Sequence, residues 1–336
     1  MKKQQWKKIA GSVLTLLVIG LVVYLVFRDN YREILRNLRS VSAGKSAVLF
    51  ALAVLYQAAE CGVAMALIRA RLPSFTYWQA VDVTFLGVFG NVATFAVGSI
   101  PMQSYRLHQY GLSVGHGIGM MTMEYVFHKT SILLYATVML LLQGRWLREA
   151  SPDLSRYLVI GYGVCILIIA ALVLVSTWGK MKALALRLLQ LLPGSGKWEA
   201  RKASWAENLE SLYAETQNVL KNRKCCLTVF LLNAGKLFCL YSAVYCSLRF
   251  LGVTALSFWR VQLLASLMLM INSALPNVAG VGPAEFAFLL LFTPFMAPAQ
   301  ASSALVLYRA ATYFFPFLLS IAVTAYFRRR AIRTTA

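Results

Sequence analysis

The sequence is poor in charged residues: 13% of its 336 residues are Asp, Glu, Lys or Arg, whereas 59% are hydrophobic. Soluble domains contain about twice that share of charge, so a water-soluble globule is excluded. A mean hydropathy of +0.65 leads to the same conclusion. The composition also excludes disordered, fibrous and disulfide-rich secreted proteins. We predict an all-α, polytopic integral membrane protein that forms a single membrane domain over residues 1–336.

Acidic residues are especially scarce, with 12 Asp and Glu against 33 Lys and Arg, which gives a net charge of +21. Such a balance is often found in proteins that bind nucleic acid. Here, however, long uncharged runs separate the basic residues into clusters, as in membrane proteins. Anionic lipid attracts the same side chains. We therefore expect a membrane partner and no nucleic acid.

The sequence also lacks the residues for metal, redox or nucleotide chemistry. Its six cysteines lie in or beside apolar runs, without a Cys-x-x-Cys and without a Cys/His cluster. Gly44-Lys45-Ser46 resembles the end of a phosphate loop, but Arg39 stands where that loop needs its first glycine. The glycines at 115, 117 and 119 follow no predicted strand, so a dinucleotide fingerprint is excluded. We expect no metal and no cofactor.

Apolar runs of about 20 residues, the length that a helix needs to cross a bilayer core, recur along the chain. The first, Ile9–Phe27, follows four lysines like a signal peptide, but lacks a small-residue cleavage pattern, so we interpret it as a retained helix. After it, Tyr31–Val41 has apolar and basic residues on opposite faces, which predicts an interfacial helix. The six predicted spans are residues 9–27, 47–68, 118–142, 157–177, 227–248 and 302–327.

Three other regions do not have the pattern of a simple span. Residues 178–224 form a polar segment with nine Lys/Arg and four Glu, long enough for one or two surface helices but not for a catalytic domain. Residues 77–110 and 261–295 are apolar but interrupted, at Gly98–Pro101 and Asn272–Pro283. Interrupted backbone is tolerated at membrane depth only where protein or a water-filled cavity satisfies its polar groups. Both regions are therefore predicted to be re-entrant hairpins.

The distribution of Lys and Arg predicts the orientation. With the N-terminus inside, 20 of these residues lie on the inside and 10 on the outside, which favours cytoplasmic N- and C-termini and a cytoplasmic segment 178–224. In this topology the two triplets of span, hairpin and span, 47–142 and 227–327, have opposite orientations. Inverted repeats with broken helices are the construction of alternating-access transporters.

Ionisable groups within apolar spans are costly, so each is a candidate functional residue. Glu124 and His128 are four residues apart and share one face of a predicted helix. Arg309, in an aromatic stretch, carries a guanidinium that suits a phosphate or a carboxylate. The candidate substrate-binding residues are Arg309, Arg106, Glu285, Glu124, His128, Tyr308, Tyr313 and Asp82.

Each candidate has a purely structural alternative. Glu285 follows the glycine-rich break, where its side chain is also a suitable cap for the N-terminus of a half-helix. Glu124 has His128 or Lys129 as a partner for a structural ion pair, and Asp82 lies near the inner surface. For Lys236, two turns from the polar segment, we favour a side chain that extends to the interface.

Two sequence blocks carry a resemblance to a known family. They are Leu275–Glu285, which joins a proline to a glycine-rich break that ends at a glutamate, and Leu307–Pro316, which contains Tyr-Arg and a later proline. The chain resembles the flippase-like transmembrane region of lysylphosphatidylglycerol synthases from about Ile9 to Phe327. Gly98–Pro101, followed by Tyr105-Arg106-Leu107, is similar to the family's first broken motif.

The resemblance implies a stand-alone member located in the cell membrane. Bifunctional members carry a C-terminal domain that transfers lysine to phosphatidylglycerol, and we do not expect that domain in a sequence that ends nine residues after Phe327. We therefore expect that this chain is not an enzyme, although the family name implies a phosphatidylglycerol lysyltransferase. The implied activity is translocation of an amphiphilic lipid between leaflets, such as lysylphosphatidylglycerol or a polyprenyl-linked glycolipid. Arg309 and Arg106 would hold its phosphate, while Glu124, Glu285 and Asp82 would balance them or meet a cationic headgroup.

Two alternatives stay open. In the first alternative, the chain is a non-catalytic partner that presents lipid to a separate synthase or glycosyltransferase. The remaining alternative is an integral-membrane transferase that uses Glu124 and His128 as acid and base, for which the sequence supplies no nucleophile or metal set. A homo-oligomer is compatible with each of these functions.

Overall fold

The computed structural model describes residues 31–94, 97–191, 197–275 and 282–335. Within these ranges the chain forms helices and no strand, so the prediction of an all-α protein is confirmed. The elements are α2 (Tyr31–Arg39), α3 (Ala43–Ile68), α4 (Tyr77–Ala93), α5 (Ser99–Gln109), α6 (Val114–Ala150), α7 (Pro152–Thr177), α8 (Gly179–Gln190), α9 (Lys197–Leu220), α10 (Arg223–Phe250), α11 (Phe258–Ala274), α12 (Pro283–Phe292), the 3₁₀ turn η1 (Thr293–Phe295), α13 (Pro298–Arg309), the π-helical η2 (Ala310–Phe314) and α14 (Phe315–Thr335).

Among the described residues, five helical stretches are long and apolar enough to cross a membrane. They are α3, α6, α7, α10 and the continuous stretch from α13 through η2 into α14. The chain is therefore a polytopic α-helical membrane protein. The predicted span 9–27 lies outside the described residues, and the other five predicted spans, 47–68, 118–142, 157–177, 227–248 and 302–327, each lie within one of these stretches.

The long helices extend beyond the apolar runs that predicted them, because side chains at their ends cap the exposed backbone. Ser42, Ser113 and Asn222 precede α3, α6 and α10, and the side chain of each accepts a hydrogen bond from an N–H of the first turn. At the start of α4, Thr76 and Gln79 form a reciprocal capping box. These polar residues fix the ends of helices whose length is set by apolar residues.

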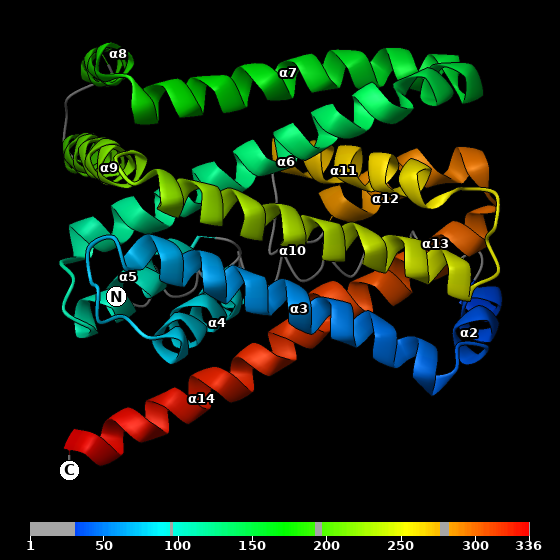
Figure 1. Ribbon diagram of the computed structural model, residues 1–336, viewed down its shortest axis with the longest axis horizontal. Helices are drawn as coiled ribbons and strands as arrows, with labels where there is room; N and C mark the ends of the chain where they lie inside the picture. The colour runs from blue at the N-terminus through cyan, green and yellow to red at the C-terminus, as the bar shows by residue number, and fades with distance from the viewer. Residues whose placement is uncertain (1–30, 95–96, 192–196, 276–281, 336) are drawn as a thin grey trace.

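The helices pack as two related sets (Figure 1). Helix α3 runs from the end of the molecule that carries α2 to the end that carries α4 and α5, and α10 packs along α3 in the opposite direction. The last helix of each set then packs against the first arm of the other set's hairpin: α6 against α11, and α14 against α4. This reciprocal pattern is what an inverted repeat produces, and it agrees with the predicted repeats.

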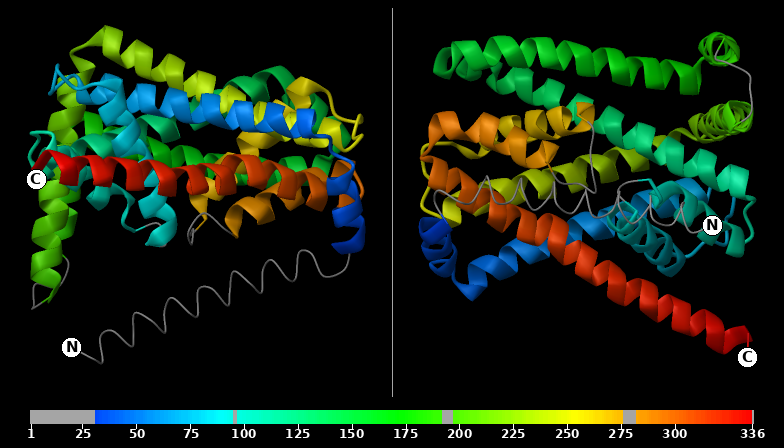
Figure 2. Two further views of the ribbon diagram at one scale, coloured as in Figure 1. Left: turned by 90° about the horizontal axis from the view of Figure 1, so that it is seen from below. Right: turned by 180° about the vertical axis from the view of Figure 1, so that it is seen from behind.

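The first hairpin consists of α4 and α5 and lies at the end of the molecule near the C-terminus (Figures 1 and 2). Its arms approach closely: a Cβ on Gly90 would lie 3.3 Å from the Gly98 carbonyl oxygen and 3.3 Å from the Ser99 Cα. The Ser99 hydroxyl donates a hydrogen bond of 3.0 Å to the Gly87 carbonyl. Glycines on α4 therefore let the two arms pack side by side.

The second hairpin consists of α11 and α12 and enters from the opposite end of the molecule (Figure 1). Its break, predicted at residues 272–283, falls largely on residues 276–281, which lie outside the described residues. At the start of α12, Gly282 has a φ of +101°, a conformation that side chains disfavour. Pro283 then occupies the first helical turn, where its missing N–H costs nothing.

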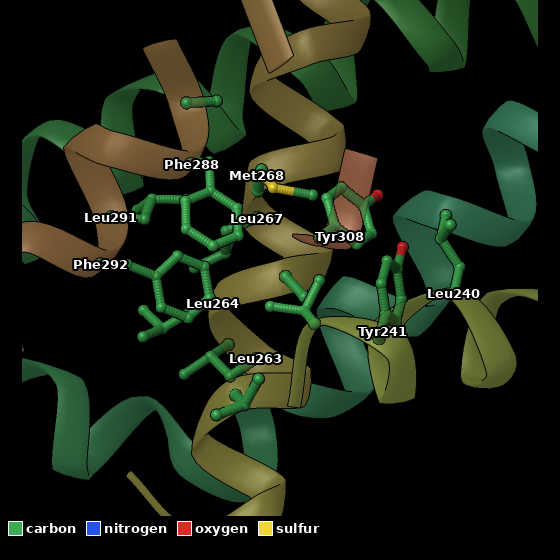
Figure 3. Close-up of a cluster of buried hydrophobic side chains, with 14 of the residues drawn as sticks. Leu240, Tyr241, Leu263, Leu264, Leu267, Met268, Phe288, Leu291, Phe292 and Tyr308 are labelled. Atoms are coloured by element: carbon green, nitrogen blue, oxygen red, sulfur yellow. The ribbon is translucent and has the colours of Figure 1, made fainter. Parts of the chain in front are cut away.

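The largest part of the hydrophobic core lies around the second hairpin (Figure 3). Phe288 and Phe292 of α12 stack with ring centroids 4.6 Å apart, and Tyr308 of α13 lies 6.2 Å from Phe288. Leucines 263, 264 and 267 of α11 fill the space beside these rings. Because these side chains are almost fully buried, they hold α10, α11, α12 and α13 together as one packed unit.

The polar segment 178–224 folds into α8 and α9, in line with the predicted surface helices. Helix α9 docks on the first turns of α6, where the Ser211 hydroxyl donates a 2.6 Å hydrogen bond to the Gly115 carbonyl. Glu215 of α9 is fully buried and lies 3.1 Å from Arg71 Nε and 2.7 Å from His116 Nδ1. This polar cluster attaches the surface helix to the membrane-crossing helices.

Candidate functional site

A polar chamber of about 690 Å³ lies between the two hairpins. Its walls come from α3, both arms of the first hairpin, α6, the last turn of α11, and the stretch around η2. Polar side chains on these walls include Gln57, Glu60, Asn91, Gln103, Glu124, His128, Lys129, Asn272, Ser273 and Thr312. Such a concentration of polar groups between helices that are otherwise apolar marks a functional site in a membrane protein.

Helix α6 contributes the charged wall of the chamber. Glu124 and His128 share one face of the helix, as predicted, and both line the chamber. Lys129 follows Glu124 by five residues, so it projects about 140° around the helix axis from it. Its ammonium donates a 2.7 Å hydrogen bond to the Ser273 hydroxyl and lies 4.9 Å from the centre of the Tyr125 ring. Within the described chain, no ion pair joins Glu124 to His128 or Lys129, so that structural alternative is not observed.

A buried ion pair closes the chamber on the side of α3 and α10. The ammonium of Lys236 pairs with Glu60, and the Lys236 side chain is fully buried. The prediction that Lys236 extends to the interface was therefore wrong, because α3 offers a carboxylate closer than the headgroup region. An ammonium without this partner would be strongly unfavourable at such a position. The two carboxylates that face the chamber thus differ: Glu60 is neutralised by Lys236, whereas Glu124 is not in an ion pair within the described chain.

Several chamber side chains present polar atoms that are not used within the described protein. The buried Gln57 Oε1, Thr84 Oγ1, His128 Nδ1 and Asn272 Oδ1 have no hydrogen-bond partner among the described residues. Buried polar atoms are nearly always satisfied, and leaving one unsatisfied costs about 1–3 kcal/mol. All four belong to residues that line the chamber. Together with the charged wall of α6, these residues give the chamber a largely polar lining.

Arg309 lies at the break of the second hairpin, and it pairs with Glu285 at 2.8 Å. The other carboxylate oxygen of Glu285 accepts a 2.6 Å hydrogen bond from the Gly282 N–H, so Glu285 also caps α12. The predicted cap is therefore observed together with an ion pair. The guanidinium carbon lies 4.2 Å from the centre of the Tyr313 ring, which in turn lines the chamber.

A π-helical segment follows Arg309 directly. Its physical cause is Pro316, which has no N–H for the Thr312 carbonyl and clashes with it in a regular α-helix. The wider turn brings Thr312, Tyr313 and Pro316 onto the chamber wall. Segments of this kind are frequent at functional sites.

Arg106 and Asp82 join the two arms of the first hairpin. Arg106 Nε lies 3.2 Å from Asp82 Oδ2, and the Tyr110 hydroxyl donates a 2.6 Å hydrogen bond to the same oxygen. Asp82 is almost fully buried, so it is not a solvated carboxylate, and its position near the inner surface stays a prediction. The first hairpin is thereby closed by its own charges.

The structure separates the eight predicted residues into three groups. Glu124, His128 and Tyr313 line the chamber. Tyr308 lies in the hydrophobic core beside Phe288. The remaining four form two ion pairs outside the chamber lining: Arg106 with Asp82, and Arg309 with Glu285.

The sequence of this chain matches a known family over most of its length. Residues 12–320 match the model of the lysylphosphatidylglycerol synthase TM region. The chain belongs to this family. The resemblance noted from Leu275–Glu285 and Leu307–Pro316 is thus confirmed, and the chain is a multi-pass membrane protein related to lysylphosphatidylglycerol synthesis. Among curated proteins, none matches this sequence.

In this family member, sequence reasoning missed part of the chamber. Glu60 and Lys129, which line the chamber, and Lys236, which pairs with Glu60, were not included among the binding residues. A signal for one pair existed: Glu60 and Lys236 have opposite charges and lie in the first spans of the two predicted repeats, α3 and α10, which an inverted repeat brings together. The amides at Gln57, Asn91 and Asn272 carry no charge, so only the structure identifies them as chamber residues.

The described part of the chain shows no site for metal chemistry and no disulfide. No group of three or more His, Cys, Asp or Glu side chains within it is placed to hold a metal ion. All six cysteines are free thiols.

Proposed function

We propose that this family member translocates an amphiphilic phospholipid between the two leaflets of the cell membrane. The headgroup passes through the chamber while the acyl chains stay in the bilayer. The observation that carries the proposal is the 690 Å³ chamber between two hairpins that enter from opposite ends, lined by Glu124, which forms no ion pair with any described residue. Without such a passage, a charged headgroup would have to cross hydrocarbon, which is strongly unfavourable.

The chamber chemistry favours a headgroup that carries both an amine and a phosphate. Glu124 offers a carboxylate to an amine, and Lys129 offers an ammonium to a phosphate about 140° around the same helix. Lysylphosphatidylglycerol combines these groups, and the family description supports its choice as the first substrate to test. A polyprenyl-linked glycolipid has the phosphate but lacks the amine. We assign no catalytic step to this chain and place its N- and C-termini in the cytoplasm, on the basis of its Lys and Arg distribution.

The test is translocation of fluorescent lysylphosphatidylglycerol in vesicles that contain the purified protein. We expect the wild type to exceed empty vesicles, and Glu124→Gln, which keeps the side-chain shape, to lower the rate about tenfold, equivalent to about 1.4 kcal/mol. Glu210→Gln on the exposed surface of α9 is the matched control and should keep the wild-type rate. A wild-type rate equal to that of empty vesicles would reject the proposal.

A second candidate is a lipid-presenting partner of a separate synthase. It is favoured by the exposed indole rings of Trp198 and Trp205 on α9, which lies at the predicted cytoplasmic end and is charged on its surface. In that case the folded wild type would bind lysylphosphatidylglycerol but would not translocate it. Binding by the purified protein, measured together with the vesicle assay, distinguishes the two functions.

A further inference from the structure

A second, smaller space lies beside the chamber, between α6, α7 and α11. This crevice of about 40 Å³ is mostly apolar, with Cys165, Ile169 and Leu172 of α7 along one side. Tyr125, Lys129 and Ser273 line both the crevice and the chamber. The two spaces therefore share a wall formed by these three residues, and the crevice lies between that wall and α7.

Helix α7 lies on the periphery of the bundle (Figure 1). In its most apolar stretch 17% of the residues are buried, the same share as in the span from α13 to α14, compared with 33% for α6 and 44% for α10. Its outer face is strongly apolar and open, with Ile160 67% exposed and Leu167 71% exposed, whereas Ile169 on the inner face is 6% exposed. A helix with this pattern contacts lipid on one side and the crevice on the other. The crevice is thus one helix away from the acyl chains of the bilayer.

Lys129 lies where the polar and the apolar spaces meet. Its ammonium is held by the Ser273 hydroxyl and the Tyr125 ring, neither of which neutralises its charge. A phospholipid has the same order of groups: a polar headgroup, then an anionic phosphodiester, then apolar chains. The Lys129 ammonium, where the chamber and the crevice meet, therefore matches the phosphodiester, where the headgroup and the acyl chains of a lipid meet.

We propose that the crevice between α6, α7 and α11 is the lateral portal of the chamber, with the lipid phosphodiester at Lys129 and an acyl chain between α7 and α11. This inference rests on the proposed function and adds the route by which the lipid enters. A crevice of about 40 Å³ is far too small for an acyl chain, so α7 must move outward to admit the chain. Because α7 is less buried than α6, it is the wall of the crevice that moves at the lower cost.

The first test uses a phosphatidylglycerol with a photoactivatable diazirine in its acyl chain, in vesicles of phosphatidylglycerol and phosphatidylethanolamine. We expect cross-links on the inner face of α7 and on α11, at residues such as Ile169 and Met270. Lys129→Met should reduce these cross-links several-fold, and Lys129→Arg should retain them because it keeps the charge. Cross-links confined to outward-facing residues such as Leu167, or unchanged in Lys129→Met, would overturn the portal.

The second test compares two tryptophan substitutions on one helix. Ile169→Trp places a large ring in the crevice and should lower translocation about tenfold, because a packed space does not admit extra volume. Leu167→Trp adds the same ring to the exposed face, two residues away, and should keep the wild-type rate. Both variants are compared at equal amounts of monodisperse protein; if Ile169→Trp does not fold, the Lys129→Met cross-linking decides.

These results separate the portal from the function on which it rests. If the wild type translocates lipid and Ile169→Trp does so at the same rate, the portal is rejected and the function stands. If the wild type does not translocate lipid, the function is rejected, and acyl cross-links in the crevice then report only a bound lipid.

Discussion

The two broken hairpins, α4–α5 and α11–α12, each contain a carboxylate that pairs with an arginine, but the arginine comes from a different place. In the first hairpin, Arg106 and Asp82 lie on the two arms, and the pair closes the hairpin on itself. In the second, Glu285 of α12 pairs with Arg309 of α13, so the pair attaches the hairpin to the following span. The two hairpins are thus built alike, but the ion pair of the first joins its own arms, whereas the ion pair of the second joins it to α13.

The hairpins also differ in what they contribute to the chamber. Both arms of the first hairpin line it, through residues such as Asn91 of α4 and Gln103 of α5. Of the described residues in the second hairpin, only Asn272, Ser273 and Leu275 at the end of α11 do so. The large hydrophobic core packs against α12 instead (Figure 3). The first hairpin therefore forms a wall, and the second is held by packing beside it.

The largest expected effect concerns the anchor of the second hairpin. Arg309→Met leaves the partly buried Glu285 carboxylate without its cation and removes the pair that attaches α12 to the following span, so we expect a loss of about 3–5 kcal/mol in folding stability. Thermal unfolding of the purified protein in detergent measures this loss. The double variant Arg309→Met/Glu285→Gln should recover part of it, because no unpaired charge remains. Wild-type stability of the single variant would show that the ion pair does not anchor the hairpin.

A smaller loss is expected in the first hairpin. Arg106→Met removes the cation from Asp82, but this pair joins two arms that already pack together and the Tyr110 hydroxyl still donates to the carboxylate, so we expect about 1–3 kcal/mol. Adding Tyr110→Phe to Arg106→Met should lower the stability further. Thermal unfolding in detergent again measures the loss of stability. If Arg106→Met loses as much stability as Arg309→Met, the two ion pairs stabilise their hairpins equally.

The smallest effect concerns backbone conformation at the break. Gly282→Ala forces a side chain into a φ of +101°, and we expect a cost of about 1–2 kcal/mol. The control is Gly235→Ala in the middle of α10, where a Cβ would have no atom within 4 Å, so alanine should stabilise the helix by up to about 1 kcal/mol. Opposite shifts in the unfolding midpoint are therefore expected, and equal shifts would contradict the assignment of strain to Gly282.

Much of the fold could be predicted because the bilayer imposes strict lengths and patterns on the sequence. Apolar runs located the five described spans, and the breaks at Gly98–Pro101 and Asn272–Pro283 located two hairpins in opposite orientations. The π-helical turn could not be predicted, because its hydrophobic pattern is that of an ordinary span. Pro316 was visible in the sequence, but its effect depends on how α13 and α14 pack.

The site was harder to predict than the fold, because burial and pairing depend on tertiary contacts. Glu124 and His128 follow from their helical spacing, and both line the chamber. Arg106 and Arg309 have the residue type that binds phosphate, but their nearest carboxylates, Asp82 and Glu285, pair with them in the folded chain. Lys236 shows the same limit, since its partner Glu60 lies 176 residues away in sequence.

Helix α6 joins the surface of the molecule to its interior without a break. It spans 37 residues, or about 55 Å, from Val114 beside the α9 docking site to Ala150 at the far end. His116, which contacts Glu215, and Glu124, which lines the chamber, therefore belong to one stiff rod. A tilt of α9 relative to the membrane would therefore be transmitted along α6 to Glu124 in the chamber.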